Sequence, residues 1–289
     1  MKKISLQDIS RSLDISKTTI SLVLNGRGDE KRVSKETQEK IIKFVKDNNY
    51  HANQLARGLS RGKSDMIGLI VPNIADTFYA RIARRIEIIA ELSGLNVVFS
   101  SSGESAKKES ELIQSMLTRQ VDGLIIASCQ QNAEDMSRLK RLKFPFVLID
   151  RHYTDIKTNY VIVDNSGGTA IAVDQLVKSG RKRIGFVTIE PGLEAISERL
   201  LGYERTMHAH GLEIKEGFVQ ESNSETYESE MPGIIKNMIQ FPTGIEGIVF
   251  ATHYLAASGL RELKRLNVRV PGDVALVSFG QMSAFDLTE

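Results

Sequence analysis

Residues 5–25, SLQDISRSLDISKTTISLVLN, have the pattern of two short helices joined by a tight turn. Ser5 and Asp8 have the spacing of a capping box, and Ser16 is placed to cap a second helix over 17–24. Three apolar residues of this second helix recur at a spacing that packs them inward: Ile20, Val23 and Leu24. Its other face carries Lys17, Thr18, Ser21 and Leu22. The stretch therefore predicts a helix-turn-helix.

A third helix completes the predicted N-terminal head. Ser34 is placed to cap a helix over 35–47. Its apolar residues Ile41, Ile42 and Val45 are expected to close a small core against the first two helices. We expect an all-α domain over residues 1–50.

The charge of the chain is unevenly distributed. Residues 1–63 hold 14 Lys and Arg against 7 Asp and Glu, a net charge of +7, and the whole chain holds 38 against 36. The remainder therefore holds 24 against 29, a net charge of −5. A solvated surface is the ordinary explanation of a basic cluster, but a basic head on an acidic body matches the electrostatic footprint of nucleic-acid binding.

Composition excludes several other classes of protein. A chain of 289 residues with 41% hydrophobic and 26% charged residues is expected to form two or three compact units. We expect neither a membrane span nor a secretory signal, and therefore a cytoplasmic protein. Cys129 is the single cysteine, and His208 and His210 have no obvious carboxylate partners, so we expect no metal and no cofactor.

From residue 66 onward, short apolar runs alternate with helical stretches, as in an α/β fold with parallel sheets. The expected strands are 66–71, 96–100, 123–127, 146–149, 161–163, 183–187, 247–250 and 274–277. The expected helices include 78–92, 105–119, 167–178, 198–210 and 254–266. Two βα series on either side of about Asn159 predict two similar lobes, 64–158 and 159–289, joined to the head by a linker over 51–63.

Ligands of such sheets bind at the carboxyl ends of the strands, so the residues after each strand form the candidate pocket. They include Asn73, Phe78, Tyr79, Ser128, Arg151, Asp164, Arg199 and His253. The sequence has no G-x-G-x-x-G after the first strand, no P-loop and no G-x-S-x-G elbow, which disfavours an α/β enzyme. A ligand-binding receptor without a DNA role remains the other alternative.

Three ordered motifs of the head and linker resemble those of the LacI/GalR family of bacterial transcriptional regulators. They are SKTTISLVLN at 16–25, Val33-Ser34-x-x-Thr37, and Asn53-x-x-Ala56-Arg57-x-Leu59. The resemblance implies that 17–25 is a recognition helix in the major groove, with Lys17 and Thr18 at base edges. Leu22 stands where the family commonly has a polar or basic base reader, so it offers apolar contact only. The implied DNA-binding residues are Ser5, Ser16, Lys17, Thr18, Thr19, Ser21, Leu22, Asn25, Arg27, Arg32, Asn53, Ala56 and Leu59.

The segment 53–60 resembles the hinge helix of the same family. In the family this helix folds on the operator, pairs with the partner's helix and inserts a leucine into the minor groove, and Leu59 matches that leucine. Unstacking a base step costs a few kcal/mol, which the extra contacts of bent DNA offset. A plain polar linker is the alternative interpretation.

The resemblance continues through most of the chain. Its further motifs are Pro72-Asn73-x-x-x-x-Phe78, Gln120-Val121-Asp122-Gly123, Asp164-Asn165, Gly180-Arg181-x-x-Ile184, Arg199-x-x-Gly202-Tyr203 and Val270-Pro271-x-Asp273-Val274-Ala275. They imply a two-lobed effector domain like that of periplasmic binding proteins. In it Phe78 would flank the effector, Arg199 would bind its polar groups, and Asn73, Tyr79, Ser128, Arg151, Asp164, His253 and Gln281 would complete the site.

Two departures from the family bear on the effector. His253-Tyr254 stands where the family commonly has Asn-Asp, and Phe279-Gly280-Gln281 stands where it has Phe-Asp-Asp. A pocket that gains an imidazole and loses a carboxylate is expected to prefer an anionic sugar derivative to a neutral sugar. The chain also ends at Glu289, where the family continues, so we expect a fragment or a shortened relative.

The resemblance predicts the function and the partners together. We expect a homodimeric repressor of carbohydrate-utilisation genes that binds near-palindromic double-stranded operator DNA in the nucleoid. A sugar or sugar derivative bound between the lobes is expected to control its operator affinity. Release of DNA by the effector and strengthening of DNA binding by the effector are both compatible with the sequence.

Overall fold

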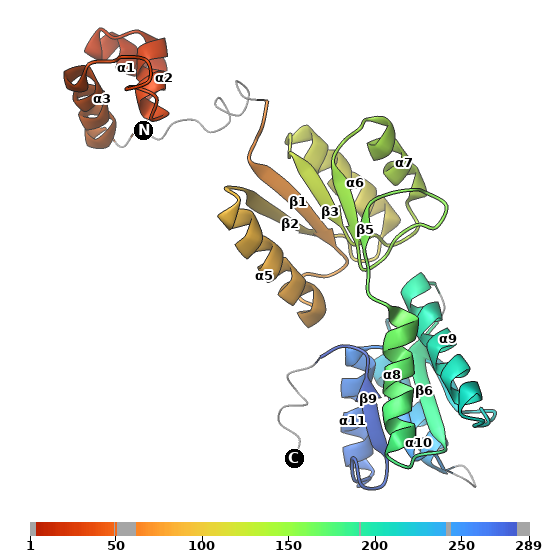
Figure 1. Cartoon of the computed structure of the whole chain (residues 1–289). Coiled ribbons are helices and arrows are strands. Elements are labelled where there is room, and N and C mark those ends of the chain that lie inside the picture. Colours follow the sequence, from red (N-terminus) through yellow and green to blue (C-terminus); the bar gives the residue numbers. More distant parts are fainter. Residues whose placement is uncertain (1–3, 49, 51–61, 191, 241–243, 282–289) are drawn as a thin grey trace. The chain divides into compact units, whose positions relative to one another are not determined.

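A computed structural model describes residues 4–48, 50, 62–190, 192–240 and 244–281 of the chain (Figure 1). Its contacts divide the chain into two units, Met1–Asp65 and Met66–Glu289. The described part of the first unit contains the helices α1 (Leu6–Leu13), α2 (Lys17–Leu24) and α3 (Lys35–Asp47). The second unit contains two parallel sheets with helices packed against them.

Serine side chains begin all three of these helices, as predicted. The Ser5 hydroxyl accepts from the N–H of Asp8 at 3.2 Å, and the Asp8 carboxylate accepts from the N–H of Ser5 at 2.9 Å, which completes the capping box. The hydroxyls of Ser16 and Ser34 accept from backbone N–H groups three residues further on. Because these side chains satisfy donors that the helix itself leaves unpaired, they fix where each helix starts.

The core of the head is small and is formed by one face of each helix. Its buried members are Ile9, Ile20, Val23 and Ile41, with Leu24, Phe44 and Val45 packed against them. The prediction that Ile42 belongs to this core is wrong, because its side chain is 54% exposed. Ile41 and Val45 are four residues apart and share a face of α3, whereas Ile42 is turned by about 100° from Ile41.

The first sheet of the second unit has the order β2-β1-β3-β4-β5, and all its strands are parallel. Its strands are β1 (Met66–Val71), β2 (Asn96–Ser101), β3 (Gly123–Ile126), β4 (Phe146–Ile149) and β5 (Tyr160–Val161). Its helices are α5 (Thr77–Leu92), α6 (Ala106–Thr118) and α7 (Ala133–Arg141). We call this sheet and its helices lobe 1.

The second sheet has four strands in the order β7-β6-β8-β9, which repeats the order of the first four strands of lobe 1, and it is again parallel. Its strands are β6 (Ile184–Ile189), β7 (Val219–Ser222), β8 (Gly247–Phe250) and β9 (Ala275–Ser278). Its helices are α8 (Asn165–Lys178), α9 (Glu194–Ala209), α10 (Tyr227–Gln240) and α11 (His253–Arg265). We call this sheet and its helices lobe 2.

Each sheet is buried on both faces, because alternate residues of its central strands enter separate cores. In lobe 1, Leu69 and Val71 pack with α5, whereas Ile70 packs with α6 and α7 (Figure 1). In lobe 2, Phe186 packs with α8 and α9, whereas Val187 packs with α10 and α11. The order of both sheets reverses beside one strand, β1 or β6, and such a reversal opens a crevice at the carboxyl ends of the strands.

The sequence patterns miss three elements of the described structure: α7, α10 and β7. Helix α7 is short and mostly charged, α10 contains Pro232, and β7 is the polar edge strand VQES. Helix α10 has its buried Met231, Ile234, Ile235 and Met238 at helical spacing, but Pro232 within this stretch argues against a helix, whereas α7 and β7 lack a long apolar run. The strand expected at 161–163 lies at Tyr160–Val161.

Gly202 sets how closely two helices of lobe 2 approach each other. A Cβ atom at Gly202 of α9 would lie 2.3 Å from the carbonyl oxygen of Ser166 and 2.9 Å from its Cα, both backbone atoms of α8. No rotamer change relieves such a clash. We predict that Gly202→Ala lowers the free energy of unfolding by about 1–3 kcal/mol, the usual effect of overpacking, and denaturant unfolding measures this.

Gly233 provides the matched control, because it lies in α10, is exposed, and a Cβ atom there would meet nothing within 4 Å. Gly233→Ala should leave stability unchanged or raise it by up to about 1 kcal/mol, since alanine favours the helix. Equal effects of the two substitutions would contradict the close approach at Gly202.

Candidate functional sites

The exposed face of α2 presents the residues expected to read DNA. Lys17 and Thr18 are exposed in its first turn, directly after the Ser16 cap. The Lys17 ammonium donates to Gln7 Oε1 of α1 at 2.8 Å, a contact that the sequence patterns did not predict. Gln7 therefore steadies the Lys17 side chain, while both remain exposed.

The other described residues of the expected DNA surface surround α2. Thr19 Oγ1 lies 2.8 Å from Ser16 Oγ, and the Asn25 amide donates to Ser21 Oγ at 3.3 Å. Leu22 is partly buried, Ser5 is the cap of α1, and Arg32 has a positive φ of 55° in the loop after α2. Asn53, Ala56 and Leu59 lie outside the described residues.

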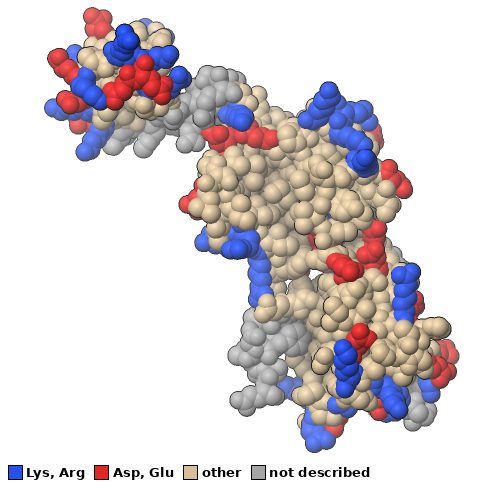
Figure 2. Space-filling model, in the orientation of Figure 1, with Lys and Arg blue, Asp and Glu red and all other residues tan. Residues whose placement is uncertain are grey.

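The loop between α2 and α3 is held by a residue that the sequence patterns missed. The Gln38 amide donates to the carbonyl of Val33 at 2.9 Å and to Asp29 at 2.8 Å. Lys35 pairs with Asp29 at 2.8 Å, and Arg27 pairs with Glu30 at 3.0 Å. Figure 2 accordingly shows acidic side chains beside basic ones on the visible face of this unit.

At the carboxyl edge of the lobe 1 sheet lies a buried arginine with acidic partners. Arg151 follows β4, is 8% exposed, and donates two hydrogen bonds to Glu104 at 2.7 and 2.8 Å. Its Nε lies 3.6 Å from Asp150, whose carboxylate accepts from the Tyr79 hydroxyl at 2.7 Å. Burial alone would lower the pKa of Arg151, but Glu104 and the other nearby charges raise it. These groups form a tightly paired wall of the candidate site.

Ser128 is buried beneath this wall and is fully engaged by protein groups. Its hydroxyl donates to Glu109 Oε1 at 2.9 Å, lies 2.9 Å from the Tyr153 hydroxyl, and accepts from the N–H of Gln130 at 3.1 Å. Glu109 also accepts from the N–H of Cys129 at 2.8 Å and is 0% exposed. The structure thus gives Ser128 a supporting position, and the sequence patterns missed Glu109 altogether.

At the carboxyl edge of the lobe 2 sheet lies a second buried arginine, and its partners are neutral. Arg199 is 9% exposed, donates from Nε to Asn165 Oδ1 at 2.8 Å, and donates from Nη1 to the carbonyl of Ala251 at 2.7 Å. Its guanidinium lies 3.8 Å from the centre of the Phe279 ring. Burial lowers the pKa of Arg199 to about 10, even though Asp150 opposes this effect. The five N–H donors of an arginine exceed the two used here, so Arg199 retains capacity for a ligand.

Polar contacts between described residues join the two lobes along these edges. His253 Nε2 lies 3.3 Å from Asp76 Oδ1, and His152 Nδ1 lies 2.9 Å from Glu194 Oε2. Gln130 accepts from the N–H of Glu194 at 3.3 Å. Arg81 donates to Gln281 at 2.7 Å. The candidate residues His253 and Gln281 thus contact lobe 1.

The remaining candidates have local structural roles as well. Asn73 is exposed, and its side chain accepts from the N–H of Ala75 at 2.9 Å. Asp164 is exposed and caps α8 through the N–H of Gly167 at 2.7 Å. Phe78 is partly buried, and its ring centre lies 5.0 Å from that of Tyr79. All three begin or precede helices at the carboxyl edges of the sheets.

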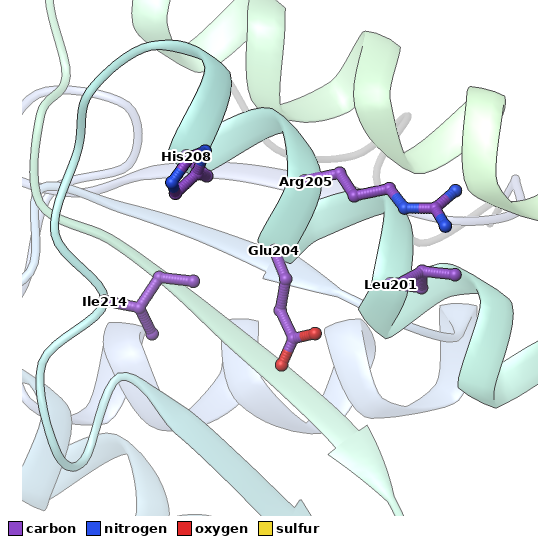
Figure 3. A pocket seen from close by; sticks show the side chains of 5 residues that line it. All are labelled: Leu201, Glu204, Arg205, His208 and Ile214. Carbon is purple, nitrogen blue, oxygen red and sulfur yellow. The ribbon is translucent and has the colours of Figure 1, made fainter.

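A separate surface hollow of about 500 Å³ lies elsewhere on lobe 2. It is lined by Leu201, Glu204, Arg205, His208 and Ile214 (Figure 3). These residues belong to the second half of α9 and to the connection that follows it. Leu201 is two residues from Arg199 and is turned from it by about 200°, so this hollow and the buried Arg199 lie on different faces of α9.

Comparison with known proteins connects both units to one class of regulator. Residues 5–53 match the bacterial regulatory proteins of the lacI family, and residues 64–288 match the periplasmic binding proteins and sugar binding domain of the LacI family. Catabolite control protein A of Priestia megaterium is 29% identical and aligns over 96% of this chain and 82% of its own length. The sucrose operon repressor of Klebsiella pneumoniae is 32% identical over 77% of this chain and 66% of its own length.

A solved structure shares the whole architecture. The lac repressor dimer bound to operator and an anti-inducer superposes with a TM-score of 0.85 at 21% identity, covering 99% of this chain and 85% of that one. A DNA-binding head on a sugar-binding α/β body defines a ligand-responsive transcriptional regulator. The chain belongs to the lacI family of bacterial regulatory proteins. It is a regulator of transcription rather than an enzyme, and its second unit matches the sugar binding domain of that family.

No helix among the described residues is both long enough and apolar enough to cross a bilayer.

Glu109 generates a prediction about pH. Burial raises the pKa of the Glu109 carboxyl above its ordinary value of 4.5, although the Cys129 N–H and the Ser128 hydroxyl oppose this. The folded chain therefore keeps this proton to a higher pH than the unfolded chain, so stability falls as the pH rises from about 4.5 through the folded pKa. Glu109→Gln cannot ionise. We predict that the unfolding free energy of the wild type relative to this variant decreases between pH 4.5 and 8, as measured by urea unfolding.

Glu111→Gln is the control, because Glu111 is exposed on the same helix. Its unfolding free energy should follow the wild type across this pH range. A Glu109→Gln variant that also follows the wild type would contradict the assignment of a raised pKa to Glu109.

Proposed function

We propose that the chain is a repressor of carbohydrate genes that reads a near-palindromic operator through α2 and binds a sugar or sugar derivative between lobes 1 and 2. The observation that carries this proposal is that one chain combines a DNA-reading helix with a ligand-binding group. The capped helix α2 exposes Lys17 and Thr18, and Arg199 at the carboxyl edge of the lobe 2 sheet has more N–H donors than its protein partners use. The family supports repression by a homodimer. Because the target is operator DNA, the protein is expected to act in the cytoplasm, at the nucleoid.

In this proposal the head covers residues 1–50, the hinge 51–63 and the effector domain 64–289, with lobes over 64–158 and 159–289, apart from the edge strand β5 (Tyr160–Val161), which belongs to the sheet of lobe 1. Lys17 donates to guanine acceptors in the major groove, and Thr18 contacts a thymine methyl. A second set of residues contacts phosphates and fixes the register: Ser5, Ser16, Thr19, Ser21, Asn25, Arg27 and Arg32. Leu22 offers apolar contact, and Asn53, Ala56 and Leu59 act in the hinge, where Leu59 opens a base step.

The effector in this proposal lies between the two arginines. Arg199 supplies N–H donors from lobe 2, and Asp150 with its partner Tyr79 supplies polar groups from lobe 1. Phe78 and His253 flank the ligand, and Arg151 with Ser128 keeps the lobe 1 edge in place. Asn73, Asp164 and Gln281 border the site at helix starts and at the edge of lobe 2. Polar groups converging on a concave site are typical of binding pockets for small polar ligands.

Selection from random duplex DNA by the purified chain tests the DNA part of the proposal and supplies the operator. A two-fold symmetric consensus is expected. On that operator, Lys17→Ala should weaken binding by about 1–3 kcal/mol and relax the base preference at one position of each half-site, while binding to random DNA changes little. Fluorescence anisotropy at fixed salt concentration measures both affinities.

Lys46→Ala is the matched control, because Lys46 is an exposed lysine in the last turn of α3, outside the proposed contact surface. It should leave operator affinity close to that of the wild type. If Lys17→Ala weakened operator and random DNA equally, Lys17 would be a phosphate contact and not a base reader.

Arg199 generates the test of the effector site. Calorimetry with neutral hexoses, hexose phosphates and hexuronic acids should find binding by the wild type. Arg199→Met should lose at least about tenfold in affinity, because hydrogen bonds to a charged group contribute about 1.5–3 kcal/mol. Arg84→Met is the control, since Arg84 is exposed and pairs with Glu87 of its own helix. Unchanged affinity in Arg199→Met would remove Arg199 from the site.

The same titrations compare two kinds of effector. Arg199 makes no ion pair within the described residues, which supports an anionic sugar derivative. Tight binding of neutral hexoses together with no binding of their phosphates or acids would overturn the anionic alternative while leaving the effector site in place.

A further inference from the structure

Two histidine–carboxylate pairs join the lobes in opposite senses. His152 of lobe 1 lies 2.9 Å from Glu194 of lobe 2, and His253 of lobe 2 lies 3.3 Å from Asp76 of lobe 1. We call these the lobe-bridging pairs. Each lobe thus contributes one histidine and one carboxylate, and the pairs lie at the carboxyl edges where the two sheets meet.

Both pairs are largely shielded from solvent. The side chains of His152 and His253 are 15% and 16% exposed, and those of Glu194 and Asp76 are 30% and 23% exposed. At such sites a charge pair is screened less by salt and water than on the open surface, where its contribution is close to zero. The protonation of these imidazoles can therefore change how strongly the two lobes attract each other.

The surroundings of His152 leave Glu194 as its partner of opposite charge. Its ring packs against Tyr160 with centres 4.3 Å apart, and its backbone carbonyl accepts from the Gln130 amide at 2.6 Å. The neighbouring Arg151 is already neutralised by Glu104. Gln130 in turn accepts from the N–H of Glu194, so both the side chain and the backbone of Glu194 in α9 contact lobe 1.

The surroundings of His253 are equally simple. Its ring meets Tyr254 edge-on at 5.5 Å, and Gly280 lies on its other side. Asp76 caps α5 and accepts from the N–H of Phe78 at 2.8 Å. Burial alone would raise the pKa of Asp76, but the hydrogen bonds from His253 and Phe78 lower it overall. Asp76 is therefore a charged partner for a protonated His253, with Tyr227, Tyr254 and Arg151 as the other titratable groups nearby.

We infer that the lobe-bridging pairs form a pH-dependent clamp that favours the closed arrangement of the two lobes when His152 and His253 are protonated. The sign follows from the pairs themselves. A protonated imidazole facing a carboxylate makes a charge-assisted hydrogen bond, which is about twice as strong as a neutral one. Because this bond exists only when the lobes are together, the closed population is highest when both imidazoles carry a proton and falls when a rise in pH removes it. The inference goes beyond the proposed function, since it concerns closure by protein groups alone.

Distance measurements within the full chain test this inference without DNA or effector, so their outcome is separate from that of the proposed function. Cysteines introduced at the exposed positions Leu142 of lobe 1 and Ile171 of lobe 2, in a Cys129→Ala background, carry a donor and an acceptor dye. Dilution with unlabelled chain confines energy transfer to one subunit. Between pH 8 and pH 5.5 the ratio of closed to open molecules should rise at least about fivefold, the lower end of typical coupling.

Replacing both histidines, as His152→Gln with His253→Gln, should abolish this pH dependence. Asp76→Asn with Glu194→Gln should abolish it too, and asparagine keeps the cap of α5. These carboxylate variants carry the test if the histidine double variant does not fold. A wild type without pH dependence, or a double variant that keeps it, would overturn the inference.

His210 provides the matched control. It pairs with Asp174 at 2.6 Å, and both residues belong to lobe 2. His210→Gln removes a histidine–carboxylate pair of the same chemistry that does not join the lobes, so the pH dependence should persist. Its loss in His210→Gln would show that general titration of the protein, and not the lobe-bridging pairs, controls closure.

Discussion

Parallel strand direction is the constraint on which the rest of the second unit depends. Within each sheet every strand runs the same way, so each connection must return across a face, and the residues after the strands collect at one edge of that sheet. These carboxyl edges contain Arg151 and Ser128 in lobe 1 and Arg199 in lobe 2. Residues far apart in the sequence become neighbours there, such as Tyr79 and Asp150, which are 71 positions apart. The site is a consequence of topology, and the side chains only decide what it binds.

The two buried arginines at these edges have different electrostatic surroundings and therefore different roles. Both are at most 9% exposed, yet Arg151 is enclosed by Glu104 and Asp150 while Arg199 touches an amide, a carbonyl and a ring. A buried charge that is fully paired stabilises a particular geometry. A buried charge whose partners are neutral is not cancelled by them, so it can still attract a ligand electrostatically. The contrast explains why the pKa of one guanidinium rises and that of the other falls to about 10. Arg151 therefore fixes the geometry of the edge, whereas the positive charge of Arg199 is not neutralised by its partners.

The sequence predicts elements well where one local signal is strong. The serine caps at Ser5, Ser16 and Ser34 and the apolar strands β1, β4 and β8 lie where their patterns indicate, because capping and burial act within a few residues. The polar edge strand β7 and the charged α7 lack such a signal, because tertiary packing and not local preference holds them. Strand-end positions located Arg151 and Arg199, but no spacing indicates that Glu109 lies under Ser128 or that Gln38 holds the loop of the head. Those contacts depend on three-dimensional distances that no local pattern encodes.

Closure of the lobes is therefore supported from two sources with different chemistry. Glu109 fixes Ser128 and Cys129, which sets the backbone of the loop that carries Gln130, and Gln130 holds the start of α9 from lobe 1. Arg199 lies about one and a half turns further along the same helix, so α9 connects the bridging contacts to the group proposed to bind the effector. A ligand shifts such an equilibrium only by its differential affinity for the two arrangements. Protein groups that already favour closure reduce the differential affinity that an effector must supply, and α9 is the element through which both influences act.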